Sequence, residues 1–351
     1  MRKLLLPFSL LFWLGVAVRN WFFDIGLLKA VKIGKPVISV GNISAGGVGK
    51  TPLVEMLAEK ISGSRKTAVV SRGYGRKSRG MITASDGNGG YAPVKETGDE
   101  SSQIASKFPG VIVIADEKRV RGALKAVELG ADVIILDDGF QHRYLHRDLD
   151  IVVMTAEEIL KGDFLLPAGN RREPVSSLER ADYLVVSRCA DIKQYESASQ
   201  EILNQVSCAA ANQGKITGLQ VKIKSFSWAS DNVNIDITQL KGKKVVAVSG
   251  IGSPDSFKSS LIKEGLIIAE HVLFPDHHWF SDMDIRNIVN TRIKTNADFV
   301  FTTEKDYVRL KELYPDFLKS EPVIIAGIRH EIIAGMERFD VTIKRCLDTA
   351  K

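Results

Sequence analysis

The fold is decided by residues 37–61, which read VISVGNISAGGVGKTPLVEMLAEKI. The apolar run Val37–Val40 is typical of a buried strand, and the stretch from Pro52 onward has the spacing of a helix. Between them lies the glycine-rich turn SAGGVGKT at 44–51. Such a turn directs a row of backbone N–H groups, a helix N-terminus and one lysine at a single point, which predicts a cradle for a nucleotide triphosphate. The match to GxxxxGK[ST] is imperfect, because Ser44 occupies the first glycine position.

Bulk composition is that of a globular protein. The chain has 351 residues, enough for two domains, with 44% hydrophobic and 26% charged side chains. Its three cysteines, Cys189, Cys208 and Cys346, lie far apart and form no CxxC pair. This usage indicates a reducing compartment and argues against a disulfide framework or a structural zinc site.

The N-terminus is both apolar and basic. Residues 4–18 read LLLPFSLLFWLGVAV, and six basic residues against one acidic residue in 1–35 account for most of the net charge of +6. Fifteen residues are short for a membrane span, which needs about twenty, and no small-x-small cleavage site follows. Arg19 and the aromatic residues after it fit the headgroup boundary. We expect a helix that lies in, or dips into, the membrane surface; the alternative is an apolar helix packed on the protein's own core.

The rest of the chain alternates apolar strands with helical patterns, which predicts an α/β fold with a parallel sheet covered on both faces. Residues 80–95 interrupt this rhythm and resemble a hairpin, and a long polar helix is expected over 194–213. The stretch 227–237 is polar and irregular, which indicates a linker. The expected organisation is an N-terminal membrane-associating helix, a P-loop domain, a linker and a second α/β domain, at residues 1–30, 31–213, 214–236 and 237–351.

Two adjacent aspartates follow the apolar run 133–136. An aspartate at the carboxyl end of a strand, beside the glycine-rich loop, is what a Mg²⁺-dependent phosphoryl transferase needs, because the metal must lie near Thr51 and the terminal phosphates. Asp137 and Asp138 point differently, so one can serve the metal and the other a lysine, a water or a substrate hydroxyl. The simpler alternative is a turn or helix-cap acid.

Other polar segments carry candidate groups with an equally simple alternative for each. Asp99 begins a helical pattern, where an aspartate usually caps the helix. Arg72 and Arg76 provide guanidinium groups suited to phosphate oxygens, although a solvated basic loop would look the same. Residues 276–278 place an acid beside two histidines, which favours an acid–base or orienting role over zinc. The sequence TEKD at 303–306 differs by one residue from a guanine-reading signature, so we reject guanine specificity and expect a helix cap.

Taken together, seven segments resemble the tetraacyldisaccharide 4′-kinases, the lipid A 4′-kinases of Gram-negative bacteria. The resemblance covers nearly the whole chain, and the segments occur in the order of that family, in which the first loop also lacks the leading glycine. They are GNISAGGVGKTP (41–52), SRGYGR (71–76), GDE (98–100), DDGFQHR (137–143), LPAGNRREP (166–174), FPDHH (274–278) and TEKD (303–306).

The resemblance implies a role for each matching residue. Asp99 would take the proton from the sugar hydroxyl, with His277 orienting it, although the adjacent His278 leaves the histidine register open. Lys50 would bridge the phosphates, and Asp138 would also serve catalysis. The implied nucleotide-binding residues are Ser44, Ala45, Gly46, Gly47, Val48, Gly49, Lys50 and Thr51. The implied metal-site residues are Thr51, Asp137, Gln141 and Glu173, and the choice between Asp137 and Asp138 stays open. The implied substrate-binding residues are Arg72, Arg76, Asn170 and Arg172.

The function implied by the resemblance is an ATP- and Mg²⁺-dependent kinase at the cytoplasmic face of the inner membrane. It would phosphorylate the 4′-hydroxyl of an acylated glucosamine disaccharide 1-phosphate to give lipid IVA and ADP. The implied fold is a P-loop NTPase-like α/β/α domain joined by a β-stranded linker to a smaller α/β/α domain. Two alternatives stay open: a kinase for another membrane sugar lipid, and a P-loop ATPase or switch recruited to the membrane. A nucleic-acid role is disfavoured, because the basic excess adjoins an apolar helix and no binding module is recognised.

Overall fold

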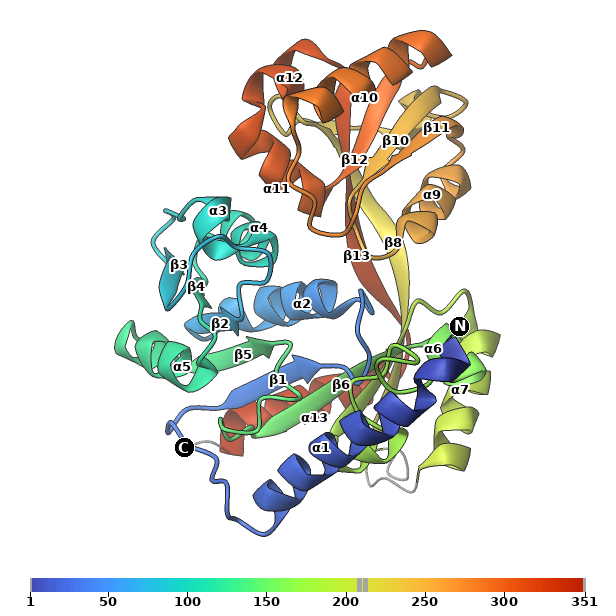
Figure 1. Cartoon of the computed structure of the whole chain (residues 1–351). Helices are drawn as coiled ribbons and strands as arrows, with labels where there is room; N and C mark the ends of the chain where they lie inside the picture. The colour runs from blue at the N-terminus through green and yellow to red at the C-terminus, as the bar shows by residue number, and fades with distance from the viewer. Residues whose placement is uncertain (1, 207–209, 211–213, 350–351) are drawn as a thin grey trace.

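The computed structural model describes residues 2–206, 210 and 214–349 and shows an α/β protein built on a mixed, mostly parallel sheet (Figure 1). This confirms the predicted fold class. The sheet order in the described part is β11-β10-β12-β13-β8-β7-β6-β1-β5-β2-β4-β3, with β9 paired to β8. Cys208 and residues 207–209 and 211–213 of the expected helix 194–213 lie outside the described residues.

The first region carries the glycine-rich loop and a parallel sheet flanked by helices. Its strands are β1 (Val37–Gly41), β2 (Thr67–Ser71), β3 (Ile82–Asp86), β4 (Ile112–Ala115), β5 (Val133–Asp137), β6 (Leu149–Thr155) and β7 (Tyr183–Ser187). Its helices are α2 (Lys50–Ser62), α3 (Val94–Thr97), α4 (Asp99–Lys107), α5 (Arg119–Glu128), α6 (Ala156–Lys161) and α7 (Ile192–Gln205), with the 3₁₀ turn η2 (Val175–Arg180). The central strand β1 pairs with β5 and β6 in parallel.

The hairpin expected over residues 80–95 does not form. Only β3 comes from this stretch, and it pairs antiparallel with β4 rather than with a following strand. The chain then reaches Pro93, which precedes the short helix α3. Because proline has no N–H to donate to a strand ladder, the second half of the stretch is unsuited to pairing.

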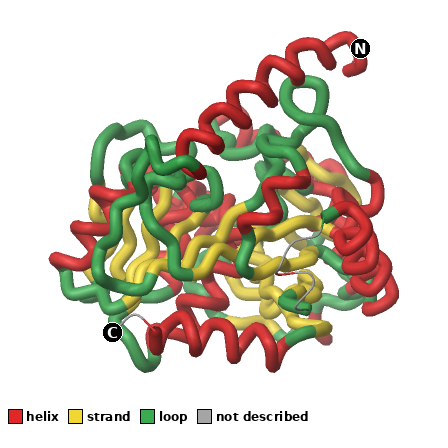
Figure 2. Tube along the Cα trace, turned by 90° about the horizontal axis from the view of Figure 1, so that it is seen from below, coloured by secondary structure: helices red, strands yellow, loops and turns green. Residues whose placement is uncertain are grey.

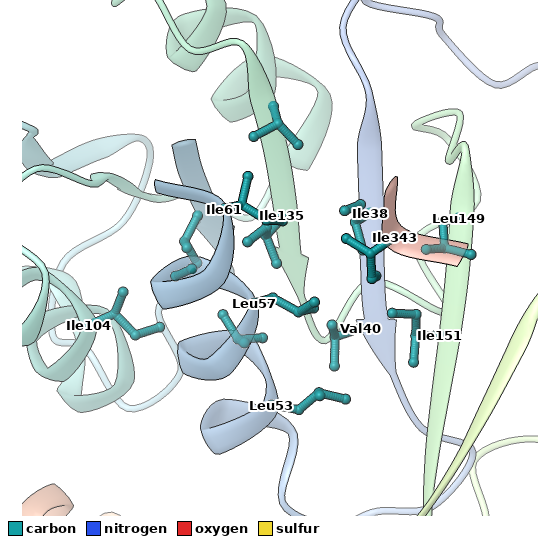
Figure 3. Packing of buried hydrophobic residues seen from close by; sticks show 14 of the residues in the cluster. Ile38, Val40, Leu53, Leu57, Ile61, Ile104, Ile135, Leu149, Ile151 and Ile343 are labelled. Carbon is teal, nitrogen blue, oxygen red and sulfur yellow. The ribbon is translucent and has the colours of Figure 1, made fainter. Parts of the chain in front are cut away.

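The core of the first region explains why α2 forms where it does (Figure 3). Leu53, Leu57 and Ile61 recur every four residues, so they share one face of the helix, and all three are buried. That face packs in one cluster with Ile38 and Val40 of β1. The loop between β1 and α2 is therefore fixed at both ends by burial of apolar side chains.

The second region lies at the far end of a long two-stranded ribbon (Figure 1). The ribbon pairs β8 (Ile216–Trp228) antiparallel with β13 (Val323–Ala334). The other elements of this region are β9 (Asn234–Ile235), η3 (Ile237–Gln239), β10 (Lys244–Ser249), α9 (Pro254–Lys263), β11 (Ile267–Leu273), α10 (Asp282–Thr295), β12 (Phe299–Thr303), α11 (Glu304–Leu313) and α12 (Pro315–Ser320).

After β13 the chain returns to the first region. The last helix, α13 (Met336–Thr349), contributes Phe339 and Ile343 to the core that contains β1 and α2. The expected second domain at 237–351 therefore differs from the structure at its C-terminal end, and the expected linker at 214–236 holds only one of the two ribbon strands. Sequence order alone does not show that a strand 100 residues later completes the ribbon.

The N-terminal helix α1 (Leu6–Asp24), preceded by the 3₁₀ turn η1 (Arg2–Leu5), runs along the outside of the body, and its N-terminal end extends beyond it (Figure 2). Of the residues of α1 only Ser9 is buried, which disfavours the alternative of a helix packed in the protein's own core. At 19 residues with a mean hydropathy of 1.3, α1 is long and apolar enough to cross a membrane by length and composition, which by itself is weak support for a membrane role.

Candidate active site

The glycine-rich loop forms one wall of a cavity of about 520 Å³. Gly49 ends the loop with a φ of +94°, a conformation that favours glycine, and a Cβ there would lie 2.9 Å from Nε2 of His330. The helix α2 starts at Lys50 directly afterwards. Residues 45–52 all line the cavity, whereas Ser44 is buried beneath it and is paired through its backbone with Arg171.

The cavity lies between the two regions and the ribbon that joins them. Opposite the loop, it is lined by 251–253 and Phe257 of the second region and by Val221 and Ile328 of the ribbon. Asp137, Asp138, Arg72 and Arg172 line it from the first region, and 276–277 and 303–305 line it from the second. A space of this size with apolar and charged walls suits a small-molecule ligand.

Lys50 already contacts acceptors at the base of the loop. Its ammonium nitrogen lies 3.1 Å from Oδ1 of Asn42 and 3.4 Å from Oδ1 of Asp138. The guanidinium of Arg172 donates to both oxygens of Asp138, over 2.9 and 2.7 Å. Burial alone would raise the pKa of Asp138, but the Arg172 hydrogen bonds and the Lys50 charge outweigh it and hold the pKa far below its usual range. Asp138 is therefore an ionised partner of two cations.

The neighbouring Asp137 has a different environment. It is 2% exposed, and its Oδ2 has no hydrogen-bond partner within the described part of the chain. Its pKa is raised to about 8 by burial, helped by the nearby charge of Glu100 and partly offset by Lys50. Gln141 is not part of the described cavity lining; its Oε1 is buried with no partner among the described residues, and its amide nitrogen donates to the carbonyl of Asn42 over 2.8 Å. Unpartnered buried oxygens beside a phosphate cradle are suited to a hard cation.

Across the cavity, Asp99 and His277 meet. Asp99 begins α4 and is 3% exposed, and Nδ1 of His277 lies 2.9 and 3.1 Å from its two oxygens. The preceding Gly98 has a φ of +84°, and a Cβ there would lie 2.6 Å from the carbonyl oxygen of Tyr74, so only glycine fits. The Tyr74 ring packs on the His277 ring at 4.7 Å between centroids. The structure therefore brings together the two residues that the resemblance paired.

Cations of the second region surround this pair. Lys305 lies 3.1 Å from Nε2 of His277 and 3.8 Å from Oδ2 of Asp99. The buried Arg309 lies 3.6 Å from the same oxygen. Burial would raise the pKa of Asp99, but the His277 hydrogen bond and the Lys305 and Arg309 charges outweigh it and lower the pKa. Asp99 is therefore held ionised, as a general base must be.

The two adjacent histidines have different partners. His277 adopts a φ of +60° and faces Asp99, whereas Nε2 of His278 lies 2.9 Å from Oδ2 of Asp284. The His278 ring stacks on Phe274 at 4.7 Å between centroids. The left-handed backbone at His277 turns the two rings in different directions, which the sequence left open. This geometry places His277, not His278, at the cavity.

Three of the residues expected at the site contact other groups in the structure. Both oxygens of Glu173 bind other groups: Arg19 at 3.5 Å, Asn20 at 3.1 Å and Arg180 at 3.0 Å. Arg76 is paired with Glu117 and donates to the carbonyl of Ala115 over 3.1 Å. Among the described residues that line the cavity, neither Glu173 nor Arg76 occurs.

The third, Asn170, acts through its backbone. Its carbonyl oxygen accepts from the N–H of Ala45 over 2.6 Å, so it supports the loop from beneath, and it too is not part of the described cavity lining. For Glu173 and Arg76 the reason is the same. The sequence shows which groups are available in a motif, but tertiary partners decide which way each side chain turns.

Several lining residues were not singled out from the sequence. Arg188 has a left-handed φ of +56°, pairs with the carbonyl of Gly47 and lies 2.5 Å from Oγ of Ser253 in the second region. His330 is buried, and burial, helped by the Arg188 charge, lowers its pKa to about 4. Lys305 belongs to the segment TEKD (303–306). The similarity of that segment to a guanine-binding signature concerns the spacing of lysine and Asp306, and it does not indicate a role for Lys305 beside Asp99. Asp306 pairs with the buried Arg309 and with Thr303, which caps α11.

Comparison with known proteins decides the family. A family model described as tetraacyldisaccharide-1-P 4′-kinase matches residues 1–347. The chain belongs to this family. The tetraacyldisaccharide 4′-kinase of Flavobacterium johnsoniae is 35% identical over 346 residues, which cover 98% of this chain and 96% of that protein. The tetraacyldisaccharide 4′-kinase of Chlorobium luteolum is 39% identical over 316 residues, covering 88% and 86%.

A solved structure agrees with the fold over the whole chain. A crystal structure of the "apo" form of LpxK from Aquifex aeolicus in complex with ATP matches with a TM-score of 0.77 and 34% identity. The match covers 99% of each chain. Family membership, fold and the arrangement around the glycine-rich loop therefore agree with the resemblance found in the sequence.

Proposed function

We propose that the protein is a tetraacyldisaccharide 4′-kinase that transfers the γ-phosphoryl group of ATP to the 4′-hydroxyl of an acylated glucosamine disaccharide 1-phosphate. The products are ADP and lipid IVA. The observation that carries the proposal is the ionised Asp99, which is bound to His277; His277 and Lys50 both line the cavity, whereas Asp99 itself is not part of the described lining. The full-length match to the family, including an ATP complex of a relative, supports the donor and the acceptor.

The proposed reaction needs positioning more than covalent help. The loop N–H groups and Lys50 hold the phosphates and stabilise the charge on the transferred group. Asp99 accepts the hydroxyl proton as the sugar oxygen attacks the γ-phosphorus, and the bond to the bridging oxygen breaks to release ADP. His277 and Lys305 orient the Asp99 carboxylate and keep it ionised.

We propose that Mg²⁺ binds beside the loop, held by Thr51 and by Asp137 with Gln141. The buried oxygens of Asp137 and Gln141, which have no partner among the described residues, support this placement, and three protein ligands would leave room for the phosphate and water ligands that Mg²⁺ usually keeps. When bound, it neutralises phosphate charge. We do not include Glu173 among the proposed metal ligands, because its side chain is bound by Arg19 and Arg180. Asp138 is left with the two cations rather than the metal.

We propose that the two regions act as domains, residues 31–213 with α13 on one side and 237–320 on the other, and that they close on substrate. His277 and Lys305 belong to the second, whereas Asp99 and Lys50 belong to the first, so the site is complete only when both are in contact. Closure of this kind would also exclude water that would otherwise hydrolyse ATP.

We propose that α1 holds the protein at the cytoplasmic face of the inner membrane, where the acylated acceptor resides. Leu10, Leu11 and Trp21 are each more than half exposed, which is typical of a helix with an apolar partner. Deletion of residues 1–25 should release the protein from membranes in a flotation assay. Because the deletion also uncovers Glu173, Leu10→Glu with Leu11→Glu is the cleaner variant. Unchanged flotation of both variants would contradict the anchor.

The decisive assay of the proposed function uses radiolabelled ATP, Mg²⁺ and purified acylated disaccharide 1-phosphate, with mass analysis of the lipid product. We expect a gain of one phosphate at the non-reducing sugar. Transfer only to another sugar lipid would favour the first alternative. Hydrolysis of ATP without any labelled lipid, together with a protein partner, would favour the ATPase or switch. We expect no dependence on nucleic acid.

A further inference from the structure

A partly exposed ammonium group lies where three helices meet. Nζ of Lys107, the last residue of α4, lies 2.8 Å from Oε2 of Glu55 on α2. It also lies 2.9 and 3.0 Å from the two oxygens of Glu304, the first residue of α11. Glu55 is 7% exposed, so this is not a solvated surface pair. One lysine therefore binds carboxylates from both regions of the molecule.

Each of the three helices begins at the cavity. The helix α2 starts with Lys50, α4 starts with Asp99, and α11 starts with Glu304 and Lys305. Lys107 is eight residues after Asp99, so both lie on one face of α4. That face contacts α11 at each end, through Asp99 with Lys305 and Arg309 and through Lys107 with Glu304. The two contacts together fix α4 against the second region.

The charges at the junction are unequal, with one cation between two carboxylates. Gln103 donates to Oε1 of Glu55 over 2.8 Å, so Glu55 is held within the first region whether or not Lys107 is present. Without the lysine, Glu55 and Glu304 would face each other uncompensated, which is costly away from water. Movement of α11 away from α4 would relieve that repulsion without unfolding either region. The lysine therefore controls the contact between the regions more than the stability of either.

From this geometry we propose that Lys107 is a positioning residue that holds the second region closed on the first, so that His277 and Lys305 reach Asp99. The proposal rests on the proposed kinase function, and it concerns a group that touches neither nucleotide nor acceptor. A further link between the regions runs from the N–H of Val94 to Oε2 of Glu312 over 2.6 Å.

The test compares kinetic parameters of variants of the full-length protein, with melting temperature recorded for each. Lys107→Met should lower kcat for lipid phosphorylation at least about tenfold while KM for ATP changes less than about twofold, because the loop itself is untouched. Lys107→Arg should recover most of kcat. The double variant Lys107→Met, Glu55→Gln should also recover part of it, since it removes one of the two facing charges and leaves Glu304 of the cavity lining unchanged. A merely structural role would not produce this rescue.

The matched control is Lys60→Met. Lys60 is also a lysine in an ion pair, at 2.9 Å from Asp340, but this pair joins α2 to α13 within the first region and is nearly half exposed. We expect kcat within about twofold of the unchanged protein. The proposal is overturned if Lys107→Met keeps its kcat per folded molecule, or if the double variant is as impaired as the single one. If the protein without any substitution fails to phosphorylate the lipid, the proposed function is overturned instead.

Discussion

The two sides of the cavity are built in different ways. The side that would bind ATP comes from a single region: the loop 44–51 and the strand end at Asp137–Asp138 contact each other through Lys50. The side that would prepare the acceptor combines Asp99 with His277 and Lys305, which lie more than 170 residues away and in the other region. Donor binding is therefore a property of one region, whereas acceptor activation depends on contact between two.

The largest effect is expected from removal of the base. Asp99→Ala and the equally sized Asp99→Asn should each lower kcat roughly 10³-fold, because neither accepts the hydroxyl proton. ATP binding, measured by calorimetry, should stay close to normal, since the loop lies in the other half of the site. Full lipid kinase activity in Asp99→Asn would contradict the assignment of Asp99 as the base, and the residues that activate the acceptor would then lie elsewhere.

A smaller loss of turnover is expected from the donor side. Lys50→Ala should lower kcat about 10²-fold and weaken ATP binding as well, because the lysine stabilises phosphate charge in both the bound and the transition state. Asp138 and Asn42 would lose a cation partner, so melting temperature should be recorded together with kinetics. Normal ATP affinity in this variant would contradict the placement of the phosphates at the loop.

The adjacent histidines offer a matched pair of variants. His277→Ala should lower kcat on the order of 10-fold to 10²-fold, because Asp99 loses its orienting hydrogen bond. His278→Ala removes a ring of the same size that contacts Asp284 and Phe274 instead, and we expect a change of less than about threefold. Equal losses in steady-state assays would show that the register assigned to the two rings is incorrect.

The smallest expected effect is a shift in pH dependence. The Lys305 charge helps to lower the pKa of Asp99, so Lys305→Met should raise that pKa and move the acidic limb of the kcat/KM profile to higher pH. In the unchanged protein the depressed pKa contributes stability that is present above the ordinary value of 3.8 and is lost as pH falls through the folded value. An acidic limb at the same pH in both proteins would show that Lys305 does not act on the Asp99 carboxylate.

The donor half and the strand pattern were predictable from local sequence. Gly49, Lys50 and the apolar spacing of Leu53, Leu57 and Ile61 each have one physical interpretation within a few residues of chain. The acceptor half was predictable only through the family resemblance, because nothing local to Asp99 indicates a partner at position 277. The choice between His277 and His278 required the backbone conformation, which sequence spacing does not give.

Differences from the expected contacts arise where a long-range partner binds a side chain. Arg76 was expected to bind substrate, yet Glu117, 41 positions away, holds it. Glu173 was expected near the metal, yet it binds Arg19 of the N-terminal helix, 154 positions away. The same applies to the second region, whose C-terminal helix returns to the first core through Phe339. Charged side chains in a motif have several possible partners, and only packing selects among them.

The docking of α1 has a consequence for how the protein would meet its acceptor. Ser9, near the start of the helix, bonds to the carbonyl of Leu165 over 2.9 Å and to the N–H of Ala168 over 3.1 Å, and Asp24, at its end, binds Arg143 over 2.8 Å. A helix held at both ends cannot act as a flexible tether. Any surface that immobilises α1 therefore also suppresses tumbling of the body and sets the direction in which the cavity opens. The encounter with a bilayer-bound acceptor then becomes a two-dimensional search at one fixed orientation.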